Sequence, residues 1–136
     1  MGLARSFREL DVYRRAGRAA KEVFSTTLTF PSEEKFALAD QIRRSSRAVN
    51  SMIAEAWARR PYPAAFINKL NEALGEAMET QAWLDHALAC GYISKETYRK
   101  MDREWQEIGA MIVGMCENAA SFCRRTVQSR KGWANG

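Results

Sequence analysis

Arginine side chains form the densest concentration of chemically active groups in this sequence. Residues 41–60 contain five arginines and one acid, and residues 124–136 contain four basic residues and no acid. Residues 61–123, in contrast, contain five basic and nine acidic residues. Concentrated positive charge of this kind predicts either phosphate binding or contact with a neighbouring subunit. The candidate residues for nucleic-acid binding are Arg43, Arg44, Arg47, Arg59, Arg60, Arg124, Arg125, Arg130 and Lys131.

Three of these arginines share one side of an expected helix. At 100° per residue, Arg43, Arg44 and Arg47 fall within an arc of roughly 100°, opposite the apolar stripe of the same helix. We therefore expect them to point away from the core of the protein. The plain alternative to phosphate binding or a subunit contact is a solvated face, on which Arg44 pairs with Asp40 one turn earlier.

Side chains that serve catalysis or metal binding are sparse. The only histidine is His86, and Trp83 stands three residues earlier, where a di-iron bundle needs a glutamate. Cys90 lies four residues after His86, but no third group or oxyanion hole completes a nucleophilic site. Cys116 and Cys123 lie about 10 Å apart along one helix, too far for a disulfide. We expect no enzyme, metal or cofactor, and three reduced, buried cysteines that are typical of a reducing compartment.

Four segments with helical periodicity must position these side chains. Proline and glycine separate the segments, and apolar residues recur within each at steps of three and four. Short connections between long helices favour an all-α, up-down-up-down antiparallel four-helix bundle. We expect this bundle over residues 1–123 and a basic, flexible tail over residues 124–136. The expected helices lie near residues 6–30, 33–60, 64–90 and 95–123, and their apolar stripes include Phe24, Leu28, Ile42, Val49, Leu70, Met78, Leu84, Trp105 and Ile112.

Capping residues predict where the helices begin and end. Ser32 and Ser94 are expected to cap the second and fourth helices, because a serine oxygen accepts a free backbone N–H there. Pro61 and Pro63 cannot continue a helical hydrogen-bond ladder, so the second helix should end before them. Gly91 suits the left-handed conformation just past the end of the third helix.

Two aromatic residues lie off or at the edge of the apolar stripe of the second helix. Phe36 and Trp57 are either boundary residues of the core or anchors for a neighbouring subunit. A closed ring of subunits needs two different, complementary surfaces on each subunit. The basic second helix and the acidic third and fourth helices supply a candidate pair of such surfaces.

Length and hydropathy limit the cellular setting. The chain has 136 residues, which suits one domain. No apolar run reaches the roughly 18 residues of a membrane span. The N-terminus also lacks the apolar region of a secretory signal. We expect a cytoplasmic protein without a membrane partner.

Several sequence blocks together resemble a known family. The most distinctive block runs through residues 41–46 and continues with Val49 and residues 53–55. The other blocks are Leu10-Asp11-Val12-Tyr13 with Ala16, Phe30-Pro31 with Glu34-Lys35, and Glu79-Thr80-Gln81 followed by Gly91-Tyr92-Ile93. Over about residues 7–123 the chain resembles the four-helix-bundle family of 23S rRNA intervening-sequence proteins. Met52 and Ala56 depart from the pattern, because the family often has Asn and Gly at these places.

The resemblance implies a bundle that assembles into a ring, typically of five subunits. A related accessory protein of diversity-generating retroelements forms a basic pentameric barrel that binds nucleic acid and a reverse transcriptase. Its relevance to this chain rests on analogy of fold alone. Two functional hypotheses follow. The first is a homo-oligomer that binds RNA or DNA without strong sequence preference, with a nucleic-acid-processing protein as a further partner. The second is an oligomeric scaffold that binds only protein.

Overall fold

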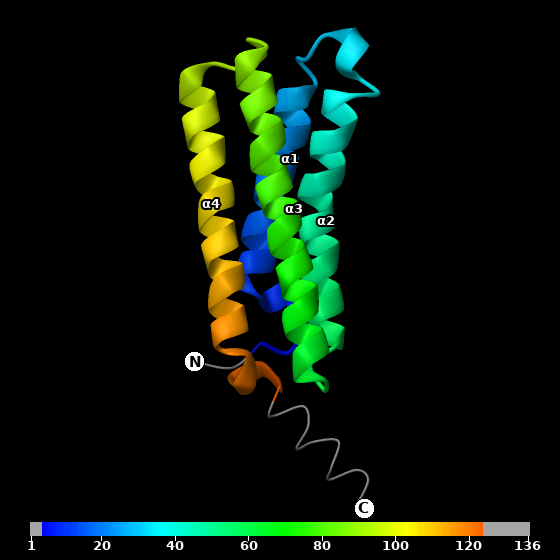
Figure 1. Cartoon of the computed structure of the whole chain (residues 1–136), viewed down its shortest axis with the longest axis vertical. Helices are drawn as coiled ribbons and strands as arrows, with labels where there is room; N and C mark the ends of the chain where they lie inside the picture. Colours follow the sequence, from blue (N-terminus) through cyan, green and yellow to red (C-terminus); the bar gives the residue numbers. More distant parts are fainter. Residues whose placement is uncertain (1–3, 124–136) are drawn as a thin grey trace, which may run out of the picture.

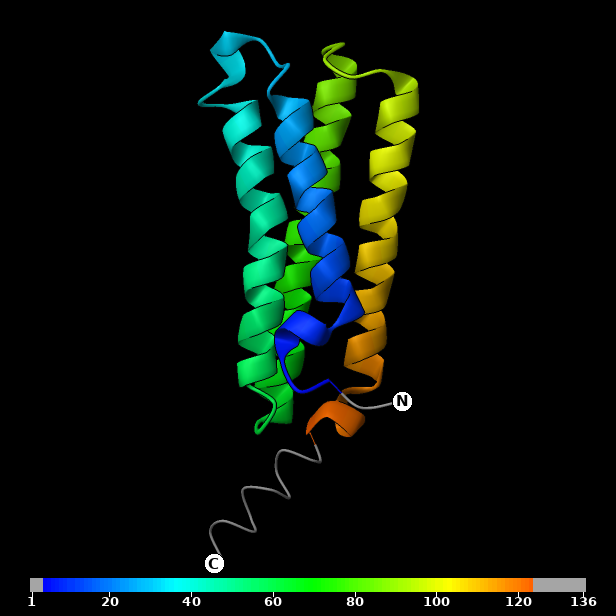
Figure 2. The same cartoon turned by 180° about the vertical axis from the view of Figure 1, so that it is seen from behind.

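The computed structural model describes residues 4–123, which form an antiparallel bundle of four long helices (Figure 1). Each helix packs against the next one in the chain, and α1 also packs against α4 (Figure 2). The predicted all-α, up-down-up-down topology is confirmed, and residues 4–123 contain no strand. The expected tail over residues 124–136 lies outside the described residues. The elements are η1 (Phe7–Glu9), α1 (Asp11–Thr27), η2 (Ser32–Glu34), α2 (Leu38–Ala58), α3 (Pro63–Ala89) and α4 (Lys95–Glu117).

The core follows the apolar stripes along the whole bundle. Each large side chain that is fully buried stabilises the fold by about 1.5–3 kcal/mol. Six residues expected in the core are at most 1% exposed: Ile42, Val49, Leu70, Leu84, Trp105 and Ile112. The expectation was wrong for Phe24, Leu28 and Met78, which are 38%, 64% and 58% exposed. On α1 the physical reason is angular drift, because steps of four carry Phe24 and Leu28 roughly 90° and 130° from the centre of the buried face.

Local signals at the ends of α3 and α4 act as expected. Gly91 adopts a φ of 75°, and its N–H donates to the carbonyl of Leu88 over 3.0 Å. Ser94 Oγ accepts the backbone N–H of Thr97 over 3.1 Å and caps α4. After Glu117, a turn at Asn118 interrupts the helix, which resumes over residues 119–123. The predicted caps at Gly91 and Ser94 are therefore confirmed.

The start of α2 differs from the expectation. Ser32 begins a short 3-10 turn instead of capping the long helix, and α2 starts six residues later at Leu38. Ala37 stands at the N-cap of α2 and makes no side-chain cap, while the carboxylate of Glu34 accepts the N–H of Leu38 over 3.4 Å. Pro63 stands at the first turn of α3, where its missing N–H leaves no helical hydrogen bond unmade.

Candidate nucleic-acid interface

Arg44 lies on the α3 side of α2, apart from the other two arginines of the expected arc. Its guanidinium forms ion pairs with Glu76 and Glu79 on α3. Within residues 4–123 it forms none with Asp40, so the expected pair one turn earlier was wrong. The helical wheel treats α2 alone, whereas the packed bundle brings the α3 carboxylates within reach. These carboxylates largely compensate the charge of Arg44.

Arg43 and Arg47 face α1 instead. Their guanidinium carbons lie 4.8 and 5.6 Å from the centre of the Phe24 ring, within the range of a cation–π contact. Arg43 Nε also donates to Thr27 Oγ1 over 2.7 Å. Arg47 is exposed, but Arg43 is half-buried between the helices and does not simply point into solvent. The expectation of one outward-facing cluster of three arginines is corrected to a pair beside α1 and a single residue beside α3.

Helix α1 adds three exposed basic residues to this side of the bundle. Arg14, Arg18 and Lys21 are spaced by four and three, so they fall within an arc of roughly 60°. The acids of α1, Asp11 and Glu22, lie about 20° and 40° beyond Arg18 on the same helical wheel. Sequence reasoning missed these three cations because it followed the local density of arginine. Their spacing at one face of a helix was the signal that could have found them.

Five basic residues of α1 and α2 form what we call the α1–α2 basic face; Figure 2 shows α1 in front with α2 beside it. Within the described part of the chain, none of the five forms an ion pair with an acid. Arg14 Nε donates to the Arg8 carbonyl over 3.1 Å and Arg43 Nε donates to Thr27, but no acid among residues 4–123 neutralises the charge of these groups, so the charge can attract an external anion. The residues of this face are Arg14, Arg18, Lys21, Arg43 and Arg47.

A groove runs between α1 and α2 under this face. One hollow of this groove has a volume of about 420 Å³ and is lined at its ends by Tyr13 and Phe24. Gly17 and Ala20 line it with backbone and a single methyl group, while Lys21 also borders it. Arg47 and Asn50 line it from α2. The groove therefore combines aromatic, small and cationic residues.

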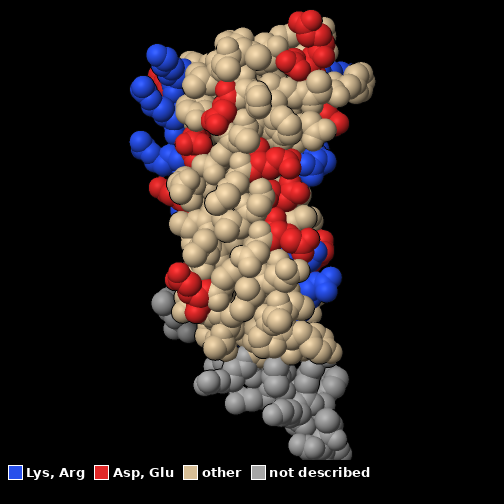
Figure 3. Space-filling view, in the orientation of Figure 1, with Lys and Arg blue, Asp and Glu red and all other residues tan. Residues whose placement is uncertain are grey.

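The neighbouring α2–α3 edge of the bundle carries a different charge pattern. Acidic side chains gather over the α2–α3 edge (Figure 3), where Lys69 pairs with Glu55 and Glu72 over 3.2 and 3.1 Å. The pairs of Arg44 lie on the same edge. Positive and negative potentials are thus placed on different sides of the bundle, as a surface for a polyanion requires.

Arg60 is occupied within the protein at the far end of α2. Its guanidinium carbon lies 3.6 Å from the centre of the Trp57 ring, and its Nε donates to the Trp57 carbonyl over 2.8 Å. Burial lowers the pKa of Arg60 from its ordinary value. Trp57 is half-buried against the core, whereas Phe36 is 86% exposed. Arg59 is exposed, and Arg124, Arg125, Arg130 and Lys131 lie outside the described residues.

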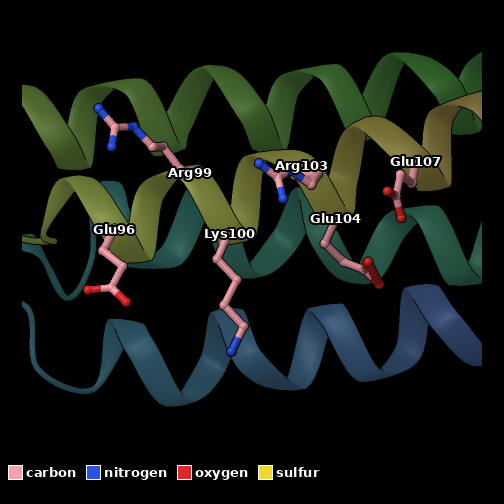
Figure 4. Close-up of a pocket in the computed structure, with 6 residues that line it drawn as sticks. All are labelled: Glu96, Arg99, Lys100, Arg103, Glu104 and Glu107. Carbon is pink, nitrogen blue, oxygen red and sulfur yellow. The ribbon is translucent and has the colours of Figure 1, made fainter.

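A second charged hollow, of about 570 Å³, lies along the outer side of α4 (Figure 4). Three cations, Arg99, Lys100 and Arg103, line it together with the acids Glu96, Glu104 and Glu107. Glu96 and Lys100 extend toward α1, whereas Arg99 and Arg103 extend to the other side of α4. Arg15 of α1 pairs with Glu104 over 2.8 Å and also with Glu107. Three acids line this hollow, whereas none lines the hollow between Tyr13 and Phe24, so the α1–α2 basic face is better suited to a polyanion.

The surface between α3 and α4 is largely uncharged (Figure 3). Met78 and Val113 are 58% and 38% exposed there, beside a small hollow of about 110 Å³. A Cβ added at Gly75 or Gly114 would meet no atom within 4 Å. We call this region the α3–α4 apolar face. Exposed apolar side chains and open helix surface make it a candidate contact for another protein chain.

The described residues hold no group of three His, Cys, Asp or Glu side chains that could bind a metal. Cys123 is buried and Cys116 half-buried, and burial raises the pKa of both thiols. Cys90 is exposed, so the expectation that all three cysteines are buried was wrong. It follows Ala89, the last residue of α3, where no element covers it. Among residues 4–123, no helix has an apolar stretch long enough to cross a bilayer.

Comparisons with known proteins bear on the fold as a whole. The family model described as "23S rRNA-intervening sequence protein" matches residues 8–114. The chain also resembles the crystal structure of a protein of unknown function from the S23 ribosomal protein family of Bacteroides thetaiotaomicron VPI-5482. The TM-score is 0.70 at 29% identity, over 78% of this chain and 95% of that chain. No curated protein matches the sequence.

Proposed function

The chain belongs to the family of 23S rRNA-intervening sequence proteins, and we propose that it is a non-enzymatic, self-assembling cytoplasmic protein that binds RNA or DNA. The observation that carries this proposal is the α1–α2 basic face. Its five cations come from two adjacent helices, and within residues 4–123 no carboxylate pairs with them. Such a surface attracts phosphates, and binding releases counterions from the nucleic acid.

The proposed binding has little dependence on base sequence. Phosphate contacts fix the position of a protein on a nucleic acid but carry no direct sequence information. The bundle is too wide to enter a groove as one helix, and its cations lie on a broad side of two packed helices. Affinity should therefore fall steeply as salt rises and vary little between sequences of the same length.

Self-assembly is the second part of the proposal, and the α3–α4 apolar face supports it. A ring needs two different surfaces on each subunit. Met78 and Val113 mark one of them, and the exposed ring of Phe36 is a candidate for the other. Trp57 offers less, because Arg60 covers its ring. The family resemblance implies five subunits, and a ring would repeat the α1–α2 basic face around its circumference and multiply weak phosphate contacts.

A scaffold that binds only protein is the competing function. The α3–α4 apolar face favours it, because an exposed apolar surface suits a protein partner as well as it suits a second copy of the chain. In this alternative the α1–α2 basic face keeps the protein soluble or contacts an acidic neighbour. Nucleic-acid binding separates the two functions.

Two matched triple variants test the proposal. One removes three exposed cations of the α1–α2 basic face, and the control removes three exposed cations of α4 whose hollow is also lined by acids. Each variant lowers the net charge by three. The first is Arg18→Ala with Lys21→Ala and Arg47→Ala, and the control is Arg99→Ala with Lys100→Ala and Arg103→Ala.

Binding to a 20-nucleotide RNA and the matching DNA duplex is measured by fluorescence anisotropy from about 50 mM salt upward. The α1–α2 variant should lose most binding and should reduce the slope of log affinity against log salt by about 2–3. The α4 control should stay close to the wild type. Equal losses in both variants would show that only net charge matters. No binding by the wild type at about 50 mM salt would favour the protein-only scaffold.

A further inference from the structure

We infer that the groove between α1 and α2 accepts an unpaired nucleobase, so that the protein prefers single-stranded over double-stranded nucleic acid. This inference rests on the proposed function, because it names the form of nucleic acid that the α1–α2 basic face binds. The ligand chemistry is a planar base whose neighbouring phosphates reach the cations at the rim of the groove.

The groove has room for a planar group because its floor is built from small residues. Gly17 has no side chain, and Ala20 contributes one methyl group. A Cβ at position 17 would lie 3.5 Å from Asn50 Nδ2, an ordinary contact distance, so one carbon fits there. A longer side chain at position 17 would extend into the hollow of about 420 Å³.

Aromatic rings stand at both ends of this floor. Tyr13 is held in place by an edge-on contact with Phe7, whose ring centre lies 5.0 Å away. Phe24 is 38% exposed, and because Arg43 and Arg47 already lie over its ring, a base at this end would stack on the guanidinium of Arg47, which the ring holds in place. Bases stack on aromatic rings and on guanidinium planes, and proteins that bind single strands combine such platforms with a basic groove.

Polar groups inside the groove suit the edge of a base. Asn50 Nδ2 donates to the Tyr13 carbonyl over 2.9 Å, and this is the single hydrogen bond of the Asn50 side chain within the described residues. The amide oxygen and the second amide hydrogen therefore remain free to pair with a base. Lys21 and Arg47 border the same hollow and can hold the phosphates on either side of that base.

The shape of the groove should make the protein bind single strands and duplexes with different affinity. In a duplex the bases are paired and stacked, so a duplex reaches only the rim cations with its phosphates. An unpaired base can turn into the hollow and add stacking to the same phosphate contacts. The two forms should therefore differ in affinity, while their dependence on the rim cations should be similar.

The test compares a 10-nucleotide single strand with the duplex of the same sequence, at one salt concentration. Wild-type protein should bind the single strand between about 5-fold and 150-fold more tightly, the range expected for stacking of one base. Gly17→Leu should reduce single-strand affinity to the duplex level and leave duplex affinity unchanged. Gly17→Ala is the matched control and should keep the preference, since its methyl group meets only an ordinary contact.

A second substitution pair keeps the test valid should Gly17→Leu fail to fold. Phe24→Leu retains apolar volume but removes the ring, and it should abolish the single-strand preference. Phe24→Tyr should restore that preference. Circular dichroism and thermal melting check that each variant keeps its helices.

Each outcome bears on one of the two proposals. Equal affinity of the wild type for both forms, or a preference that survives both Gly17→Leu and Phe24→Leu, overturns the groove inference and leaves the proposed function standing. Absence of binding to either form overturns the proposed function as well. Adenosine monophosphate is titrated as a separate probe. If it binds as tightly as the 10-nucleotide strand, the groove holds free nucleotides and the single-strand inference is wrong.

Discussion

Ser45 and Thr80 share a hydrogen bond of 2.8 Å in the middle of an otherwise apolar interface between α2 and α3. Both side chains are fully buried. Ser45 Oγ lies 3.3 Å from the Ile42 carbonyl and Thr80 Oγ1 lies 2.9 Å from the Glu76 carbonyl, so one hydroxyl donates to its own helix while the other donates across the interface. Buried polar groups are tolerated when they are paired in this way. The pair thereby links the register of the two helices.

Loss of one partner of this pair should cost more than loss of both. Ser45→Ala leaves the Thr80 hydroxyl with one hydrogen bond fewer and should lower the free energy of unfolding by about 1–3 kcal/mol. The double variant Ser45→Ala with Thr80→Val should be less destabilised than the sum of the two single variants. Urea unfolding, followed by circular dichroism, measures all four proteins. Strictly additive losses would show that the pair makes no cooperative contribution.

Two glycines should respond to alanine in opposite directions. Gly91 has a φ of 75°, so Gly91→Ala should lower the free energy of unfolding by about 1 kcal/mol. Gly75 lies inside α3 with open space around its Cα, so Gly75→Ala should raise that free energy by about 0.4–1 kcal/mol. Thermal melts of the two variants measure the difference. A loss of stability in Gly75→Ala would indicate a contact at this position that a Cβ disturbs.

Alkaline pH should weaken the end of the bundle near the α1–α2 and α3–α4 connections. A hydrogen bond to Glu34 raises the pKa of Tyr92 to about 12, and one to Asp85 raises the pKa of Tyr98 to about 12. In the unfolded chain a tyrosine titrates near pH 10. The two tyrosines therefore add to the free energy of unfolding below about pH 10, and this contribution is lost as the pH rises toward 12.

Absorbance of tyrosinate and thermal melts between pH 9 and about 12 measure this loss. The double variant Tyr92→Phe with Tyr98→Phe should lose less stability over the same pH range, because its rings cannot ionise. A double variant with the same alkaline profile as the wild type would assign the loss to other groups, such as the thiols of Cys116 and Cys123.

Signals confined to one helix were predictable from the sequence. Ser94 and Gly91 act through their own backbone neighbours, and the central core residues follow from spacing alone. Ser32 does not cap α2, because residues 32–34 form a 3-10 turn and α2 begins only at Leu38. The residue at which a helix begins depends on the path of the preceding turn, which the local sequence pattern does not specify.

The candidate site required the packed bundle. The helical wheel of α2 places Arg43, Arg44 and Arg47 on one side of the helix. In the bundle, Arg44 forms ion pairs with carboxylates of α3, whereas Arg43 and Arg47 contact the Phe24 ring of α1. The basic face also depends on Lys21, which only the pairing of α1 with α2 brings beside Arg47. The sequence of one helix predicts the direction of its side chains, whereas the neighbouring helices determine which charged groups form ion pairs.

Self-assembly should depend on the α3–α4 apolar face. Light scattering of the wild type at micromolar concentration should give a mass several times the 15.4 kDa of one chain, with five copies expected from the family resemblance. Met78→Glu with Val113→Glu places two like charges on this face, and burying them against a neighbour without partners would be costly. This variant should dissociate to monomers while keeping its helical circular dichroism.

Leu28→Glu is the matched control for that variant. Leu28 is 64% exposed and apolar, but it lies at the end of α1, away from α3 and α4. Its substitution should leave the assembly intact and change the free energy of unfolding by no more than about 0.5 kcal/mol. If Leu28→Glu dissociates the assembly and the Met78 and Val113 variant does not, the contact lies at the α1 end of the bundle. A monomeric mass for the wild type would show that the ring hypothesis is wrong, and the basic face would then act on single bundles.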